Sequence, residues 1–178
     1  MSLDDTFGPC LEAGRTIANQ EFQYNPQSLQ RLDEQTGPLL GKYLDTAIGG
    51  LKIPRLIHRA NTILWLVDNN GDVWFAIEEV VDIDTGTYLY ALALSQEKTN
   101  NHVKLGHPSL LMSTTDKRAR IGGEIKYVPR HGCWVINNRS GRYGTRPHQT
   151  AAHLEAVAAK FKDYEIPLKV VFEEPVTS

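Results

Sequence analysis

The sequence predicts an α+β fold in which N-terminal helices precede a mainly antiparallel sheet and one C-terminal helix packs on that sheet. Residues 1–50 carry apolar side chains at helical spacing, whereas residues 51–178 alternate short β-rich runs with tight turns before one further helical pattern. With 178 residues, of which 41% are hydrophobic and 22% charged, the chain can bury a core of its own. We therefore predict a single domain over residues 1–178, with a helical part at 1–50 and a β-rich part at 51–178.

Three helices are expected in the N-terminal part. The first covers residues 10–22, where apolar side chains recur loosely at helical spacing. Pro26 opens a second helix, which Pro38 interrupts because proline removes a backbone donor and clashes with the preceding turn. The third covers residues 38–48 and ends at the pair Gly49-Gly50.

Short strands are expected from residue 53 onward, separated by turns. Asn70-Gly71 tolerates the positive φ of a hairpin turn, and residues 129–132 form a second hairpin connection. The expected strands cover residues 53–58, 63–67, 72–81, 85–94, 121–128, 133–137 and 166–172.

For two later parts of the chain the sequence predicts the structure in more detail. Residues 85–94 are almost continuously apolar, which favours a central strand, and residues 95–102 are polar enough to form an exposed loop. Thr150 is a credible N-cap for a helix over residues 151–164, whose apolar side chains recur every three or four positions.

The small net charge of −2 conceals a strong division of charge along the chain. Residues 1–102 hold seven basic and fourteen acidic side chains, whereas residues 103–162 hold eleven basic and three acidic ones. Such a basic segment suggests a positively charged surface that attracts anionic ligands. The alternative is that its basic residues scatter around the sheet and pair with the acidic half.

Three glycine-containing clusters lie in this basic segment, at residues 106–109, 122–124 and 137–144. Glycine beside polar residues lets backbone and side chains approach a ligand closely. Together the clusters supply a histidine, a glutamate, arginines and a tyrosine, the groups that acid–base chemistry on a phosphate-bearing substrate requires. The structural alternative is that they are three ordinary turns of a β-rich protein.

We identify His107, Glu124 and Tyr143 as candidate catalytic residues. Glu124 lies on a predicted strand among many cations, which keep a carboxylate ionised as a base or as a stabiliser of developing positive charge. The alternative is that it neutralises Arg120 or Arg142 across the sheet. His107 is expected at a strand end and is of the side-chain type that titrates nearest to neutral pH, although a turn histidine is the simpler interpretation. Tyr143 can stack on a base or donate a hydrogen bond.

Ser109, Arg139, Ser140 and Arg142 are candidate substrate-binding residues. Ser109 follows His107 by two positions and projects to the same side if that segment is extended, but it lacks the context of a nucleophile elbow. Arg139 and Arg142 can fork onto phosphate or carboxylate from a donor-rich turn that also holds Ser140. The structural alternative for this turn is a long connection before the last helix.

Two weaker patterns suggest other chemistry. Asp116 followed by Glu124 and Lys126 loosely matches the carboxylates and lysine of metal-dependent nucleases. Cys133 follows His131-Gly132, surroundings typical of catalytic cysteines, but it opens an apolar strand in which a free cysteine acts as a small hydrophobe. The histidines and the two cysteines form no zinc motif. We therefore expect no metal and no cofactor.

The order of these motifs resembles modules at the C-termini of bacterial secretion-system effectors and polymorphic toxins. The similarity covers residues 107–172 and rests on H-P-S-L, then G-G-E, then I-N-N-R-S-G-R-Y-G, followed by an amphipathic helix and a strand. In such modules the last motif often reads S-G-H-Y, and Arg142 takes the place of that histidine here. The resemblance implies a toxin-type effector, the cargo of a contact-dependent secretion machine.

The preferred hypothesis is a toxin-type effector enzyme that acts on a phosphate-containing substrate by metal-independent RNA cleavage. Glu124 would be the base and His107 the acid, while Arg139 and Arg142 would hold the phosphate. The preference for RNA rests on the basic segment, because phosphate contacts dominate nucleic-acid affinity.

Two alternatives remain open. One is ADP-ribosyl transfer or NAD⁺ cleavage, with NAD⁺ as co-substrate. In that reaction Glu124 would stabilise an oxocarbenium-like centre while His107, Ser109 and Tyr143 hold the nicotinamide end. The other is a non-catalytic immunity, adaptor or inhibitor protein that grips a partner through complementary charges.

The expected location is the cytoplasm. The chain begins with no basic and apolar leader, so we expect no Sec-type signal peptide. No apolar run approaches the roughly 20 residues of a membrane helix. Delivery by a secretion system is an implication of the resemblance. The expected partners are an RNA or nucleotide substrate and a cognate immunity protein, with no membrane.

Overall fold

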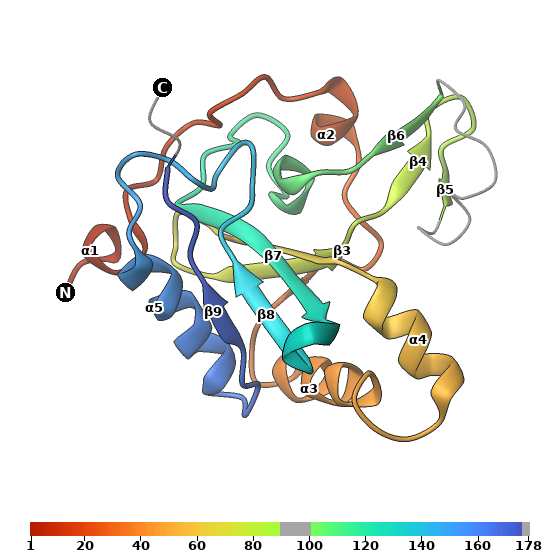
Figure 1. Cartoon of the computed structure of the whole chain (residues 1–178). Coiled ribbons are helices and arrows are strands. Elements are labelled where there is room, and N and C mark those ends of the chain that lie inside the picture. Colours follow the sequence, from red (N-terminus) through yellow and green to blue (C-terminus); the bar gives the residue numbers. More distant parts are fainter. Residues whose placement is uncertain (90–100, 176–178) are drawn as a thin grey trace.

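The computed structural model describes residues 1–89 and 101–175, and it confirms the predicted α+β class (Figure 1). A six-stranded sheet forms its centre, in the order β1-β3-β2-β7-β8-β9. Neighbouring strands are antiparallel except for β8 and β9, which are parallel. The strands are β1 (Gln30–Arg31), β2 (Ile63–Val67), β3 (Val73–Ile77), β7 (Ile121–Val128), β8 (Cys133–Asn137) and β9 (Lys169–Val171).

A second, three-stranded sheet projects from the molecule in the order β5-β4-β6, with β4 at Val80–Asp82, β5 at Thr87–Leu89 and β6 at His102–Lys104 (Figure 1). A central strand was predicted over residues 85–94. For the described residues 85–89 this is wrong, because β5 lies at an edge of this sheet. Residues 90–94 of that prediction, and residues 95–100 of the predicted loop, lie outside the described residues.

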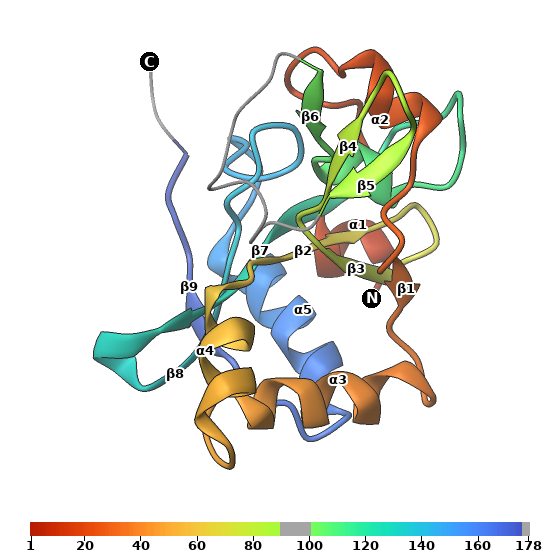
Figure 2. The same cartoon turned by 90° about the vertical axis from the view of Figure 1, so that its right-hand side faces the viewer.

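The helices are distributed on both sides of the large sheet. Figure 2 shows α3 and α5 on one side, with α2 and the smaller sheet on the other. None of the described helices is long and apolar enough to cross a membrane. The helices are α1 (Leu3–Phe7), α2 (Asn19–Gln23), α3 (Thr36–Thr46), α4 (Lys52–Ala60) and α5 (Ala151–Lys162), with short 3-10 helices η2 (His107–Leu110) and η3 (Pro129–His131).

The N-terminal part holds less helix than predicted. Of the helix expected over residues 10–22, α2 forms the last third, while Leu11 instead forms a β-bridge with Ala119. The segment after Pro26 makes a turn and the short strand β1, not a helix. Tertiary pairing with distant strands therefore outweighs the weak local helical pattern.

The strand predicted over residues 53–58 is wrong, because α4 covers this segment. Ile53, Leu56 and Ile57 lie at helical spacing, and Pro54 occupies the first turn, where a missing amide proton costs nothing. The helix α3 begins at Thr36, and Pro38 likewise lies in its first turn, where the missing amide proton costs nothing. Residues 1–50 thus also hold the short strand β1, and the part after residue 50 begins with α4.

Both faces of β2 are covered, so all five of its residues are buried. Ile63, Trp65 and Val67 face the larger apolar cluster, which includes side chains of α3 and α5. Leu64 and Leu66 face a smaller cluster on the opposite side of the sheet. This second face carries η2 and the loop after β8, and the candidate site lies there.

Candidate functional site

A cleft of about 370 Å³ brings together five of the seven predicted site residues. They come from three separate parts of the chain: the start of η2, the middle of β7 and the loop that follows β8. The register of the sheet pairs Glu124 with Leu64, so the glutamate lies on the same face of β7 as η2. The five residues are His107, Glu124, Arg139, Ser140 and Arg142.

His107 is buried and neutral at the wall of the cleft. Its Nε2 lies 2.7 Å from the Gly123 carbonyl oxygen. Because a carbonyl can only accept, Nε2 carries the proton and Nδ1 keeps the lone pair. Burial lowers the pKa of His107 to about 4, and the nearby Arg142 adds to this effect, whereas the bond to Gly123 opposes it. His107 is therefore a base, not an acid, at neutral pH.

Glu124 lies at the edge of the cleft with its side chain 18% exposed. Its Oε2 is 3.4 Å from the Lys126 ammonium, two residues along the same face of β7. Its backbone amide donates to Asn137 Oδ1 at 3.0 Å, which fixes the strand beneath it. The predicted alternative partners, Arg120 and Arg142, instead bind Asp4 and Glu21.

Arg142 is held by Glu21, a residue that the sequence did not single out. Arg142 Nη2 lies 2.7 Å from Glu21 Oε1, and the Glu21 side chain is only 2% exposed. Glu21 also accepts the backbone amides of Ala18 and Gly106, each at 3.1 Å. A Cβ on Gly106 would lie 2.7 Å from Glu21 Oε2 and 2.8 Å from Arg142 Nη1, so a larger residue there would displace the ends of this ion pair. No sequence spacing links residues 21 and 142, and the pairing follows only from the fold.

Arg139 and Ser140 occupy the other side of the cleft. Arg139 is exposed and its Nε donates to Glu173 Oε1 at 2.5 Å. Ser140 is buried, and its hydroxyl oxygen accepts the Tyr143 amide at 3.1 Å, which closes the turn. Arg139 therefore remains available to a ligand, whereas Ser140 shapes the loop.

Ser109 and Tyr143 do not line the cleft. The Ser109 hydroxyl donates to the Gly106 carbonyl at 2.6 Å, and the Tyr143 hydroxyl donates to the Lys117 carbonyl at 2.6 Å. Both residues are fully buried. Burial also raises the pKa of Tyr143 well above its ordinary value. We therefore assign these two side chains to the support of the cleft wall and not to contact with a ligand.

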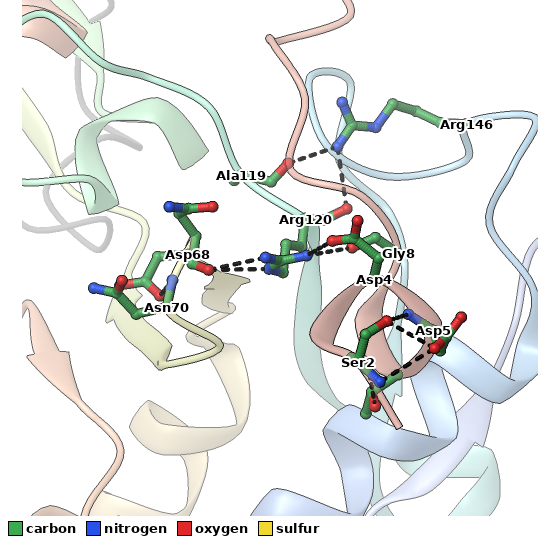
Figure 3. Close-up of polar contacts among 11 residues, drawn as sticks. Ser2, Asp4, Asp5, Gly8, Asp68, Asn70, Ala119, Arg120 and Arg146 are labelled. Atoms are coloured by element: carbon green, nitrogen blue, oxygen red, sulfur yellow. Dashed lines mark hydrogen bonds and ion pairs between the residues drawn. The ribbon is translucent and has the colours of Figure 1, made fainter.

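The basic segment does not form the open positive surface that its composition suggested. Arg120 is buried, and Figure 3 shows its guanidinium beside Asp4 and the Gly8 carbonyl. Arg146 donates to backbone carbonyls that include that of Ala119, at 3.1 Å. Lys117 is likewise buried, with its ammonium on two carbonyls. Arg120 thus joins the segment to the acidic N-terminal half, and Lys117 and Arg146 bind backbone carbonyls of the segment itself.

The described residues contain no group of three or more histidine, cysteine, aspartate or glutamate side chains placed to hold a metal ion. Asp116, the first carboxylate of the nuclease-like pattern, is bound by Arg118 at 3.0 Å. It lines a hollow different from that of Glu124. Cys133 is half-buried, at the start of β8.

A larger hollow, of about 650 Å³, lies between the β2–β3 turn, the end of β1 and the C-terminal end of α5. Its charged lining includes Arg31, whose guanidinium faces Asp33 and Asp72 at 3.9 and 3.8 Å. None of its described lining residues is a histidine, cysteine or serine. The combination of a neutral histidine, three glutamates and two arginines therefore distinguishes the smaller cleft.

Comparisons of the chain with protein-family models, with curated proteins and with solved structures found no match. The cleft is therefore interpreted from its own geometry. It is lined by a neutral histidine, by the carboxylates of Glu78, Glu124 and Glu173, and by two guanidinium groups. Such groups can take part in acid–base chemistry, and guanidinium groups can bind an anion.

Proposed function

We propose that the chain is a toxin-type effector enzyme whose cleft cleaves the N-glycosidic bond of a dinucleotide of the NAD⁺ class. The observation that carries this proposal is the meeting of His107, Glu124, Arg139 and Arg142 in one cleft, with the histidine held neutral. The resemblance of residues 107–172 to effector modules supports the biological role.

The protonation of His107 favours this reaction over RNA cleavage. Metal-independent cleavage of RNA benefits from an acid that protonates the departing 5′ oxygen, and His107 was the expected acid. With a pKa of about 4 it is not an imidazolium at pH 7, and its one remaining N–H is bonded to the Gly123 carbonyl, so it is a poor acid. Nicotinamide needs no such acid, because it leaves its cationic glycoside as a neutral molecule.

Each of the four residues has a separate role in this reaction. The Glu124 carboxylate stabilises positive charge that develops at C1′ of the ribose as the C–N bond breaks. The bonding electron pair passes to the nicotinamide nitrogen, and a water molecule or an acceptor hydroxyl forms the new bond to C1′. His107 Nδ1 accepts the proton that this nucleophile loses. Arg139 and Arg142 bind the phosphates.

The proposal is tested by incubating the purified protein with NAD⁺ and, separately, with total RNA. We expect nicotinamide release and intact RNA. Glu124→Gln should reduce nicotinamide release by about 100-fold or more, the usual cost of losing one electrostatic stabiliser. Glu155→Gln, an exposed glutamate on α5, is the matched control and should leave the rate unchanged.

Other outcomes would overturn the proposal in distinct ways. RNA degradation without nicotinamide release would favour the nuclease. Absence of both reactions, with cellular toxicity insensitive to Glu124→Gln but abolished by Arg139→Glu, would favour a non-catalytic binding protein. NAD⁺ labelled in its adenylate half distinguishes the two NAD⁺ reactions. ADP-ribosyl transfer places the label on an acceptor molecule, whereas hydrolysis does not.

A further inference from the structure

The exposed face of β7, β8 and β9 carries a second set of charged residues next to the cleft. The register pairs Lys126 with Val135 and Val135 with Lys169, so these three side chains lie on one face of the sheet. Glu124 is on the same face of β7, two residues before Lys126. The opposite face, with Ile125 and its neighbours, packs into the larger apolar cluster.

A groove of about 190 Å³ lies on this face. Val128 and Val171 provide apolar surface at its sides, and the buried Val135 lies between them on the middle strand. Basic side chains surround them, and two of these, Arg130 and His131, belong to η3 at the end of the β7–β8 hairpin. The basic lining residues are Lys126, Arg130, His131 and Arg139.

The groove has unpaired positive charge. Lys126 and Arg139 each have a glutamate partner. Arg130 and Lys169 are exposed and have no carboxylate partner within the described part of the chain. Lys169 Nζ lies 3.0 Å from His131 Nδ1. The pKa of His131 is lowered by desolvation and then by Lys169 and Arg130, which is consistent with a positive potential there.

The groove and the cleft are adjacent. Arg139 and Glu173 line both, and their ion pair forms the boundary between the two hollows. The Glu124–Lys126 pair similarly spans the two, with Glu124 in the cleft and Lys126 in the groove. A ligand that is held at Glu124 would therefore reach the valines by crossing the Arg139–Glu173 pair.

We propose that the groove binds the second half of the dinucleotide, with the pyrophosphate on Arg139 and the basic rim and the flat base on the valine surface. This inference rests on the proposed function, since it assigns the part of the same substrate that does not react. Guanidinium and ammonium groups suit phosphate oxygens. Apolar side chains suit the face of a base, as in most small-molecule sites.

Kinetics of the intact protein test the assignment. Arg130→Glu and Lys169→Glu should raise KM for NAD⁺ by about tenfold or more, with little change in kcat. The same variants should leave cleavage of nicotinamide mononucleotide, which lacks the second nucleoside, almost unaffected. Lys162→Glu, an exposed charge reversal at the end of α5, is the matched control. Equal effects on both substrates, or on neither, would overturn the proposal.

Direct binding separates this inference from the proposed function. ADP, which carries the second half of the substrate, is titrated into the wild-type protein and followed by NMR at His131, Val135 and Val171. Shifts at these residues that Arg130→Glu abolishes would support the groove even if NAD⁺ were not cleaved. NAD⁺ cleavage without any ADP response at these residues would overturn the groove and leave the proposed function intact. RNA that shifts them when ADP does not would also overturn it.

Discussion

Arg142 donates to the buried carboxylate of Glu21 across 121 residues of sequence, with 2.7 Å between Nη2 and Oε1. The carboxylate also accepts the Gly106 amide, directly before His107. One ion pair therefore joins α2, the start of η2 and the loop after β8. The position of His107 and of the arginine loop depends on this contact.

Removal of Glu21 should destabilise the protein strongly. Glu21→Ala leaves Arg142 without its partner and two backbone amides unsatisfied, so we expect a loss of about 3–5 kcal/mol in the free energy of unfolding. Arg142→Ala should also be strongly destabilising, because it leaves the Glu21 carboxylate, only 2% exposed, without its cation. In a double-mutant cycle by urea denaturation the two losses should be clearly less than additive. Simple additivity would contradict the coupling.

The stability should fall in mild acid because of His107. The pKa of the folded state, about 4, lies below the ordinary value of 6.5, so the unfolded chain binds a proton more readily between these values. Stability is therefore complete above about pH 6.5 and is lost as the pH falls toward 4. Between pH 7 and pH 5 the wild type should lose about 2 kcal/mol more than His107→Gln. Equal losses in the two proteins would show that His107 is not held neutral.

Tyr143→Phe should affect stability and not catalysis. The substitution removes the hydroxyl that donates to the buried Lys117 carbonyl, which should cost about 1–2 kcal/mol of unfolding free energy. Nicotinamide release per folded molecule should stay within about twofold of the wild type, because the hydroxyl does not line the cleft. A large fall in kcat with normal stability would restore the catalytic role first predicted for this residue.

Gly123→Ala should disrupt the sheet under the site. A Cβ at this position would lie within 1.8 Å of the Asn137 carbonyl oxygen, so β7 and β8 would have to separate. We expect a loss of about 3 kcal/mol or more, measured by thermal or urea unfolding. Gly49→Ala is the control, since no atom lies within 4 Å of its new methyl group. If both variants were equally stable, the close approach at Gly123 would be refuted.

The β-rich core was predictable from sequence because its signals are local. The strands β2, β7 and β8 have the predicted bounds, and Thr150 caps α5 as expected. Their apolar alternation and turns agree with the tertiary packing. The prediction for the α4 segment was wrong because three apolar residues in so short a run, Ile53, Leu56 and Ile57, fit a strand or a helix.

The site was predictable in part, because some of its signals are also local in the sequence. Glycine-flanked polar clusters at strand ends marked the cleft, and the structure brings His107, Glu124 and Arg142 to it. What residue type cannot reveal is the partner of each group. The burial that keeps His107 neutral, and the pairing of Arg142 with Glu21, both arise from contacts between distant segments.

The most direct test of the account is to locate bound NAD⁺ on the protein. The Glu124→Gln variant, which should bind without turnover, is titrated with NAD⁺ and followed by residue-resolved NMR. We predict saturable shifts at Gly106, His107 and Gly141, around the cleft. Shifts confined to the larger hollow at Arg31 and Asp72, or no saturable binding, would contradict the assignment of the cleft as the substrate site.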